Sequence, residues 1–543
     1  MKMKKITKKF LPLLLVVLMI SSLLIGCNSS NNKGSELSGD NNTSNAGDDV
    51  LKVRKTTSLV STDWEKTTST EDMTIVWIQV FEGLYGINES EGGYYKELAK
   101  DVQVSDDQTA YTVSLVDATF QNGDELKASD VVFSYNRAMA NARFNYITNM
   151  IESVKEIDDK TVEFTLKYPY AAFDHTLFSV KISSEREVTE AGDSFGTKPH
   201  TAGTGPYIIS EYDPASGVKL TAYENYWGGA PDIKKVEYVV ITEDSAAVIA
   251  YENKELDYIH DAPTAEWEAL SAASEGNNDL IKGNSIRCLY INWQSTVNNN
   301  ILSNEYVRQA IYYAVNKENI VKASTNGYGT VANEYIPSEY CATSPPASEG
   351  GFETYGYDPE KSKQLLKEAG FTDEDIEKGI YVGTLTTYGA QTGEKAKAAT
   401  VVQANLAEVG LKCDVEVADV AIISPRLHSF DYDLCIFGDS GNFDFNNIRQ
   451  QVHSESVGMN VVNYVAEDSP LDYERVEELC TLGVSTTDVE KRLEYYTELW
   501  SRVMDSATIL PLFNMPAGIV WSEDVDPGAL NPTYYHINHF SWK

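Results

Sequence analysis

Alternating apolar and polar residues mark strands in the first half of the chain. The alternation is clear at residues 111–115 (Tyr-Thr-Val-Ser-Leu) and again at 162–166 (Val-Glu-Phe-Thr-Leu). Successive side chains of a strand point to opposite faces of its sheet, so each stretch predicts a strand with one buried face. Between them, residues 130–140 predict a helix that starts at Ser129 or Asp130.

Apolar stripes at helical spacing dominate the middle of the chain. They run through residues 303–321 and 399–409, where apolar residues recur three or four positions apart. Another helix has clear end signals, with Asp358 as N-cap, Pro359 in the first turn and Gly370 just past the end. The middle of the chain is therefore predicted to be rich in amphipathic helices.

Residues 395–438 switch twice between the two periodicities. The predicted order is a helix, a strand, a helix and a buried strand, at residues 399–409, 411–417, 421–430 and 432–438. Such alternation is typical of a sheet covered by helices. The predicted fold class is therefore α/β.

The last sixty residues carry one more helix and one more strand. Thr487 and Glu490 have the spacing of a capping box ahead of a helix that includes residues 493–503. Residues 509–514 (Ile-Leu-Pro-Leu-Phe-Asn) predict a strand. The chain shows no fixed-period repeat.

The amino terminus has the pattern of a secretory signal. Five lysines precede the uncharged run 10–25, which is about 16 residues long and shorter than the roughly 20 needed to span a bilayer. The run ends in Leu-Ile-Gly before Cys27, which resembles a bacterial lipobox. That resemblance implies a signal peptide at 1–26 and a lipid on Cys27. The alternative is a signal-anchor helix in which this cysteine is incidental.

Residues 27–49 predict a disordered tether that begins at the lipid-carrying Cys27. The segment is rich in Asn, Ser and Gly and has almost no apolar side chains, so it cannot bury a core. A folded body on such a tether stays near the membrane. The predicted location is the extracellular face of the cell membrane in a Gram-positive-like arrangement.

Length and charge limit what the folded body can do. The 543 residues exceed one ordinary core and predict at least two lobes. The formal net charge of −37 opposes binding to nucleic acid, whose phosphates are also negative. Five cysteines besides Cys27 have no C-x-x-C spacing, which argues against a zinc site or a dense disulfide framework. One disulfide remains open.

Several stretches together resemble the extracellular solute-binding proteins of family 5, the peptide- and nickel-binding receptors of ABC importers. Each stretch is weak alone, but their order and spacing cover nearly three hundred residues. They lie at 80–87, 98–115, 120–139, 203–209, 223–241, 307–321 and 357–371. One departure is Val116-Asp117-Ala118, where the family has a basic-Lys-Gly turn.

The resemblance implies a two-lobed, periplasmic-binding-protein-like fold of type II with an extra subdomain. Lobe I is expected at 50–288 and 507–543, with an inserted subdomain at 82–198, and lobe II at 289–506. Ligand binds in the cleft, and hinge closure presents the loaded form to a permease and its ATPase. The expected molecule is a monomer that needs no cofactor and no metal.

Candidate ligand-binding residues follow from the fold and the resemblance. Ligands of open α/β sheets bind beyond the carboxyl ends of strands, so the loop 439–447 is expected to face the cleft. In peptide-binding relatives this loop supplies an acid for the peptide amine. A gapless match places Asn442 there, with Asp439 and Asp444 close by.

The other peptide terminus and one aromatic pair add to the hypothesis. No arginine lies between Arg308 and Arg426, where a carboxylate clamp is expected, so a receptor that grips the peptide backbone is favoured over a strict dipeptide receptor. Tyr226 and Trp227, just before a Gly-Gly turn, form either a ligand wall or an anchor in the core of lobe I.

The sequence also allows functions other than peptide import. An oligosaccharide or another uncharged solute suits the same architecture, and an extracellular peptide sensor has the same sequence features. The Gly-Asp-Ser-Gly at 438–441 resembles the nucleophile turn of trypsin-like proteases, but the matching histidine motif is absent. A metal receptor lacks a supporting His/Cys cluster. The sequence therefore predicts a binding protein and not an enzyme.

Overall fold

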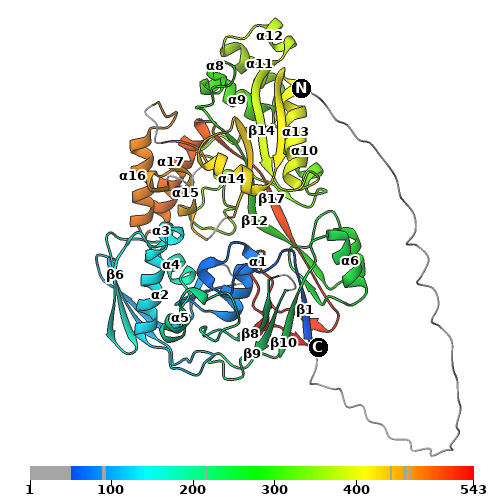
Figure 1. The fold of residues 1–543 in the computed structure, drawn as a ribbon. Coiled ribbons are helices and arrows are strands. Elements are labelled where there is room, and N and C mark those ends of the chain that lie inside the picture. The colour runs from blue at the N-terminus through cyan, green and yellow to red at the C-terminus, as the bar shows by residue number, and fades with distance from the viewer. Residues whose placement is uncertain (1–49, 89–92, 215–216, 441–442, 457–460, 465–467) are drawn as a thin grey trace, which may run out of the picture. The chain divides into compact units, whose positions relative to one another are not determined.

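The computed structural model describes residues 50–543 except for 89–92, 215–216, 441–442, 457–460 and 465–467 (Figure 1). The described residues of 50–543 belong to one compact unit. The predicted signal peptide, Cys27 and the tether lie outside the described residues. Within the described part of the chain, every helix is too short or too polar to cross a bilayer.

One large mixed sheet runs through the described chain. Its strands pair in parallel and antiparallel fashion, and β13 (Thr330–Val331) pairs with β17 away from the main path. In order across the sheet, the other strands are β15 (Leu411–Ala418), β14 (Ile380–Tyr388), β16 (Leu434–Ser440), β12 (Asn278–Ile291), β17 (Ile509–Trp521), β11 (Tyr258–Ile259), β1 (Val50–Lys55), β10 (Lys235–Val240), β9 (Gly217–Ala222) and β8 (Tyr207–Asp213).

Three smaller sheets lie apart from it. The four-stranded sheet is antiparallel, in the order β4 (Ala99–Val104), β5 (Ala110–Leu115), β7 (Thr161–Leu166) and β6 (Ile151–Asp158). The two pairs are β2 (Tyr85–Ile87) with β3 (Tyr94–Lys96), and β18 (Val525–Asp526) with β19 (Ser541–Trp542).

Helices cover these sheets. Those before β12 are α1 (Thr70–Met73), the π-helix η2 (Thr74–Val80), α2 (Ala128–Ala140), α3 (Asn145–Thr148), α4 (Phe173–Ser179), α5 (Glu185–Ala191), α6 (Asp244–Glu252) and α7 (Trp267–Ala273). Those after it are α8 (Val297–Asn300), α9 (Glu305–Ala314), α10 (Lys317–Ser324), α11 (Pro359–Glu368), α12 (Asp373–Lys378), α13 (Glu394–Glu408), α14 (Val420–His428), α15 (Arg449–Val452), α16 (Tyr473–Ser485) and α17 (Val489–Asp505).

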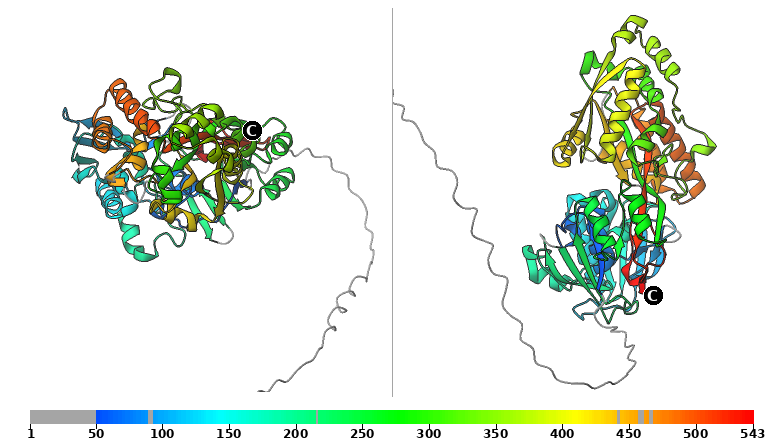
Figure 2. Two further views of the ribbon diagram at one scale, coloured as in Figure 1. Left: turned by 90° about the horizontal axis from the view of Figure 1, so that it is seen from above. Right: turned by 90° about the vertical axis from the view of Figure 1, so that its right-hand side faces the viewer.

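Buried apolar side chains gather into two large cores and one small one. What we call the first core comes mainly from residues 51–258, with 519–540 added, and the second core from 286–513. A small third cluster lies around α6 and α7. Strands β12 and β17 contribute to both large cores, and they run as an antiparallel pair from one to the other (Figures 1 and 2).

Most elements predicted from periodicity are present. The alternating stretches form β5 and β7, the predicted helix at 130–140 is α2, and Asp358 caps α11 by accepting a bond of 2.9 Å from the Lys361 amide. Two strands are longer than the sequence predicts. Both lie near the place where β12 and β17 pass from one large core to the other, which we call the crossing. The predicted strand at 509–514 continues to Trp521, and the one expected to end at Gly438 continues to Ser440.

The predicted capping box before α17 is wrong. The N-cap is Asp488, whose carboxylate accepts from the amides of Glu490 and Lys491 at 3.1 and 3.2 Å. A carboxylate at a helix N-terminus also benefits from the helix dipole. Thr487 instead accepts a bond of 3.1 Å from the Gln108 side chain, which belongs to the first core's side of the molecule.

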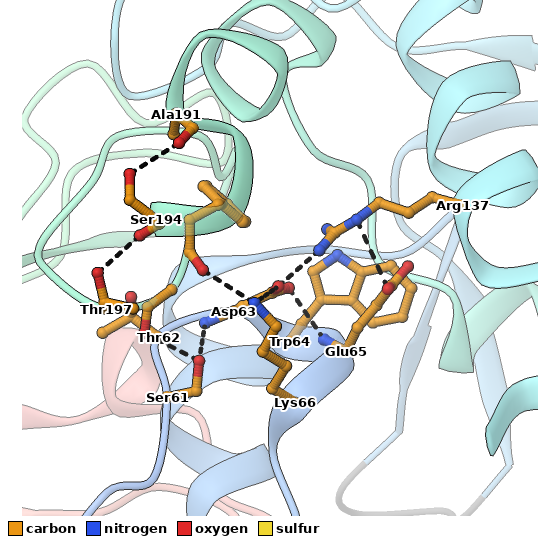
Figure 3. A network of polar contacts seen from close by, with 12 residues as sticks. Ser61, Thr62, Asp63, Trp64, Glu65, Lys66, Arg137, Ala191, Ser194 and Thr197 are labelled. Carbon is orange, nitrogen blue, oxygen red and sulfur yellow. Dashed lines mark hydrogen bonds and ion pairs between the residues drawn. The ribbon is translucent and has the colours of Figure 1, made fainter. Parts of the chain in front are cut away.

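A polar network fastens the segment 61–66 to α2 and to the loop after α5 (Figure 3). Arg137 on α2 contacts the fully buried Asp63 at 2.5 Å. The Gly196 carbonyl accepts from the Thr62 amide at 3.0 Å and from the Ser61 hydroxyl at 2.9 Å. These bonds join residues more than seventy positions apart, so they fix the part of the chain predicted as an inserted subdomain to the first core.

Gly203→Ala is expected to destabilise the fold by about 1–3 kcal/mol. A Cβ at this position would lie 2.0 Å from the Val80 carbonyl oxygen, so the backbone must shift. Gly356→Ala is the matched control, because its Cβ would meet nothing within 4 Å. Urea unfolding of both variants measures the difference. Equal unfolding midpoints would contradict the close packing of η2 against residues 203–205.

Candidate functional site

A cavity of about 260 Å³ lies at the crossing, beside the paired strands β12 and β17. Polar and apolar residues line it about equally, and Met515, Ala517 and nearby prolines are among the apolar ones. The polar side chains that line it include Thr70, Asp261, Asn284, Ser285, Arg287 and Thr533. A concave site with a few charged groups in an apolar frame is typical of a small-molecule binding site.

A bulge in β12 creates one wall of this cavity. Lys282 pairs with Pro516, but the next pair is Ile286 with Asn514, so residues 283–285 stand opposite Met515 alone. Bulges redirect side chains and often lie next to binding sites. Gly283 is required here, because a Cβ would lie 2.0 Å from the Met515 carbonyl oxygen.

Arg287 connects the cavity to the second core. Its Nε and Nη2 each donate to Glu394 Oε1 at 3.2 Å, and Lys395 contacts the same oxygen at 2.7 Å. The Lys395 ammonium also lies 4.5 Å from the centre of the Tyr388 ring. Burial opposes ionisation of Glu394, but Arg287 and Lys395 outweigh it and lower its pKa to about 2. The cluster therefore carries a formal charge of +1 beside the cavity.

Strand β16 leaves room for this arginine. Gly438 pairs with Arg287 across the strands, and a Cβ on Gly438 would lie 2.8 Å from the arginine Nη1. The guanidinium lies over the β16 backbone because this position has no side chain. In the same ladder Asp439 pairs with Ile286 and Ser440 with Ser285, so the loop predicted to face the cleft begins beside the cavity.

The structure bears differently on the three candidate ligand-binding residues of the loop 439–447. The backbone of Asp439 lies in β16, and Asn442 lies outside the described residues, so the role of each stays a prediction. Asp444 is buried, and Arg492 Nη2 contacts its two carboxylate oxygens at 2.7 and 2.5 Å. It also accepts from the Asn446 amide at 2.9 Å. These bonds favour a structural role for Asp444.

Tyr226 and Trp227 contact a buried acid in the first core rather than the cavity at the crossing. The tyrosine hydroxyl donates to Glu82 Oε1 at 2.6 Å, and the tryptophan Nε1 donates to Glu82 Oε2 at 2.9 Å. Glu82 is 2% exposed, and burial raises its pKa. This arrangement favours the alternative considered for the pair, an anchor in the core of lobe I.

Aromatic rings join the loop after β16 to the first core. Phe443 meets Tyr94 edge-on at 5.5 Å, and Tyr94 in turn lies 5.5 Å from Phe178. Phe178 lies 6.1 Å from Tyr534, the neighbour of the cavity residue Thr533. The contacts pack the Phe443 side chain against the first core.

Disulfides and metal sites are two other features for which the sequence makes predictions in the described part of the chain. All five cysteines described here are buried, and the disulfide that the sequence left open is not formed among them. Across the described ranges, no group of His, Cys, Asp and Glu side chains has the arrangement of a metal site. Gly438 to Ser440, part of the protease-like motif, lies in a strand rather than in a turn.

Asp261 and Arg287 were missed as candidates from the sequence. Arg287 gave a detectable signal, because it is the one charge within the otherwise uncharged run 285–291 that leads into the crossing. It lies before Arg308, outside the stretch 309–425 in which a carboxylate clamp is expected. Asp261 gave no local signal, since an acid after a short strand is common in loops.

The chain is similar to known binding proteins. The family model "Bacterial extracellular solute-binding proteins, family 5 Middle" matches residues 93–454. The glutathione-binding protein GsiB of Salmonella typhi is 28% identical over 347 residues, 62% of this chain and 64% of that protein. The dipeptide-binding protein of Escherichia coli K12 is 27% identical over 443 residues, 76% and 79% of the two chains. The match thus spans a little under two thirds of the glutathione-binding protein.

Solved structures agree in fold. NikA from Brucella suis, in complex with Fe(III)-EDTA, has a TM-score of 0.79 at 21% identity, covering 91% of this chain and 100% of that one. The oligopeptide-binding protein AppA from Bacillus subtilis, in complex with a nonapeptide, has a TM-score of 0.75 at 20% identity, covering 91% and 99%. The predicted periplasmic-binding-protein-like α/β fold is confirmed, and the chain belongs to the bacterial extracellular solute-binding proteins of family 5.

Proposed function

We propose that this chain captures peptides in the cavity at the β12–β17 crossing and delivers them to the permease and ATPase of an ABC importer. The observation that carries the proposal is a cavity at a strand crossing, lined by both an acid and an arginine. A peptide with free termini offers the complementary charges, and its amides match the polar side chains Asn284, Ser285 and Thr533. Peptide and glutathione binding by the relatives agrees with this ligand class.

The proposed mechanism is closure of two lobes without covalent chemistry. The proposed lobes are lobe I at 50–288 with 507–543 and lobe II at 289–506, with β12 and β17 as the hinge. The presence of two large cores, joined by this strand pair, supports the division, although residues 286–288 and 509–513 pack in the second core. Ligand favours the closed form in proportion to its higher affinity for that form. X-ray scattering should therefore give a smaller radius of gyration with peptide than without it. An unchanged radius would contradict hinge closure.

Mass spectrometry of the protein purified from its own cells is expected to detect bound peptides. Calorimetry with a peptide mixture and a glycan mixture gives the direct comparison, and heat of binding is expected from the peptide mixture only. Binding of glycans alone would replace the peptide proposal with the oligosaccharide alternative. Turnover of any peptide during the titration would contradict a receptor that leaves its ligand unchanged.

We further propose that Cys27 carries the lipid that holds the protein at the extracellular face of the membrane. The proposal rests on the lipobox-like Leu-Ile-Gly-Cys and the polar segment after it. Metabolic labelling with a fatty-acid analogue is expected to mark the wild-type protein and not Cys27→Ser. Equal labelling of both would contradict the assignment.

A further inference from the structure

Asp261 places a carboxylate in the cavity that no described residue pairs with. It lies two residues after the end of β11, it is exposed to solvent, and it lines the cavity at the crossing. Among the described residues, none donates a hydrogen bond to this carboxylate or forms an ion pair with it. A charged group held in a concave site without a partner is an expected feature of a ligand contact.

The backbone of Asp261 has an uncommon conformation. Its φ of +54° lies in the left-handed region, which few residues other than glycine adopt. The next amide, of Ala262, donates to the Gly518 carbonyl on β17 at 2.6 Å and ties the loop to the crossing strand. Such conformations persist where surrounding structure enforces them, and they concentrate at functional sites.

The charged neighbours of Asp261 are engaged elsewhere. Glu71 accepts from the Thr56 amide at 3.1 Å, and Arg287 donates to Glu394. The His260 Nδ1 lies 3.2 Å from the Tyr258 hydroxyl. Neighbouring protein atoms partly desolvate the carboxylate and raise the pKa of Asp261, against the weaker opposing effects of His260 and Arg287. A cation from a ligand would offset that desolvation.

Resting on the proposed function, we propose that Asp261 binds the free ammonium group of a short zwitterionic peptide whose carboxylate lies toward Arg287. Arg287 lines the same cavity, and the positively charged cluster that it forms with Glu394 and Lys395 attracts the anionic end. The volume of about 260 Å³ is below the range of about 300–1,000 Å³ that holds drug-sized ligands, so the ligand is short.

This assignment changes two expectations from the sequence. The amine contact moves from the loop 439–447 to the loop after β11. The arginine expected between residues 309 and 425 is replaced by Arg287 on strand β12. A short ligand with both termini free is therefore favoured over a long peptide held by its backbone.

The test uses Asp261→Asn and three pooled libraries. Asparagine keeps the shape and tolerates the left-handed backbone but loses the charge. Glu275→Gln is the matched control, since Glu275 is an exposed acid with φ +52° that does not line the cavity. The libraries are dipeptides and tripeptides with free termini, the same pool N-acetylated, and the same pool C-amidated. Calorimetry gives affinities, and melting without ligand checks that each variant folds.

The expected result is a loss of affinity that is not additive. N-acetylation of the pool and Asp261→Asn should each weaken binding about tenfold or more, because each removes one member of an ammonium–carboxylate pair. The variant should bind the free and acetylated pools with equal affinity. C-amidation should weaken binding to wild type and to Asp261→Asn by the same factor, and Glu275→Gln should behave as wild type.

The outcomes separate this assignment from the proposed function. If wild type binds the free pool but Asp261→Asn binds it equally well, the assignment is overturned and peptide capture stands. If wild type binds free and acetylated pools alike, the ammonium contact is likewise overturned. If wild type binds none of the three pools while its fold is intact, capture of short peptides itself fails, and the role of Asp261 fails with it.

Discussion

Replacing Arg492 with methionine is expected to lower the free energy of unfolding by about 3–5 kcal/mol. The Arg492 and Asp444 side chains are only 6% and 13% exposed, so the substitution leaves a carboxylate inside the protein without its cation. Arg492 Nε also donates to the Gly483 carbonyl at 2.8 Å, near the end of α16. That carbonyl loses its donor as well, which adds to the loss.

Urea unfolding of Arg492→Met against Arg475→Met measures this effect. Arg475 forms an ion pair of 2.6 Å with Glu498 on the neighbouring helix, but these side chains are 29% and 37% exposed. Exposed pairs contribute about 0–1 kcal/mol, so the control should change little. Adding Asp444→Leu to Arg492→Met should recover part of the lost stability, because the unpaired buried charge is removed. Equal losses from the two single arginine substitutions would contradict a desolvated ion pair.

Local chemistry explains why much of the fold could be predicted. The alternation of β5 and β7, and the N-cap of α11 at Asp358, depend on residues close together in sequence. Strand β17 was only half predicted because Pro516 and Gly518 interrupt its pattern. Both are accommodated at the crossing, where Pro516 flanks the β12 bulge and a Cβ on Gly518 would lie 2.8 Å from the Trp267 ring. Those contacts are tertiary and leave no local signal.

The candidate site depends more than the fold does on contacts between residues that are far apart in sequence. Asp444 looked available for a ligand because its partner Arg492 lies 48 positions away on another helix. Arg287 and Asp261 meet at one cavity only because β12 bulges opposite β17 and the loop after β11 is tied to that strand. A sequence gives the chemistry of each side chain, but it does not show which charges are already neutralised by others.

Stability is expected to fall as pH rises above about 4.5, in part because of Glu82. Burial is the main cause that raises its pKa above the ordinary value of 4.5, against the lowering effects of Tyr226, Trp227, Thr204 and Lys181. The folded protein therefore keeps a proton that the unfolded chain has released. The stabilising contribution is complete below the unfolded pKa and is lost as pH rises through the folded one. Each pKa unit corresponds to about 1.4 kcal/mol.

Glu82→Gln should flatten this dependence between about pH 5 and 7, since it removes the titrating group while keeping the side-chain shape. Glu97 titrates in the same direction, because burial and Glu82 raise its pKa, so some slope should remain. Lys181 acts oppositely, since burial lowers its pKa, but it titrates at higher pH. Urea midpoints across this range measure the slope, with Glu152→Gln on exposed β6 as the control. A slope in Glu82→Gln as steep as in wild type would show that Glu82 is ionised throughout, and the burial of its carboxylate between Tyr226 and Trp227 would then need another compensating cation.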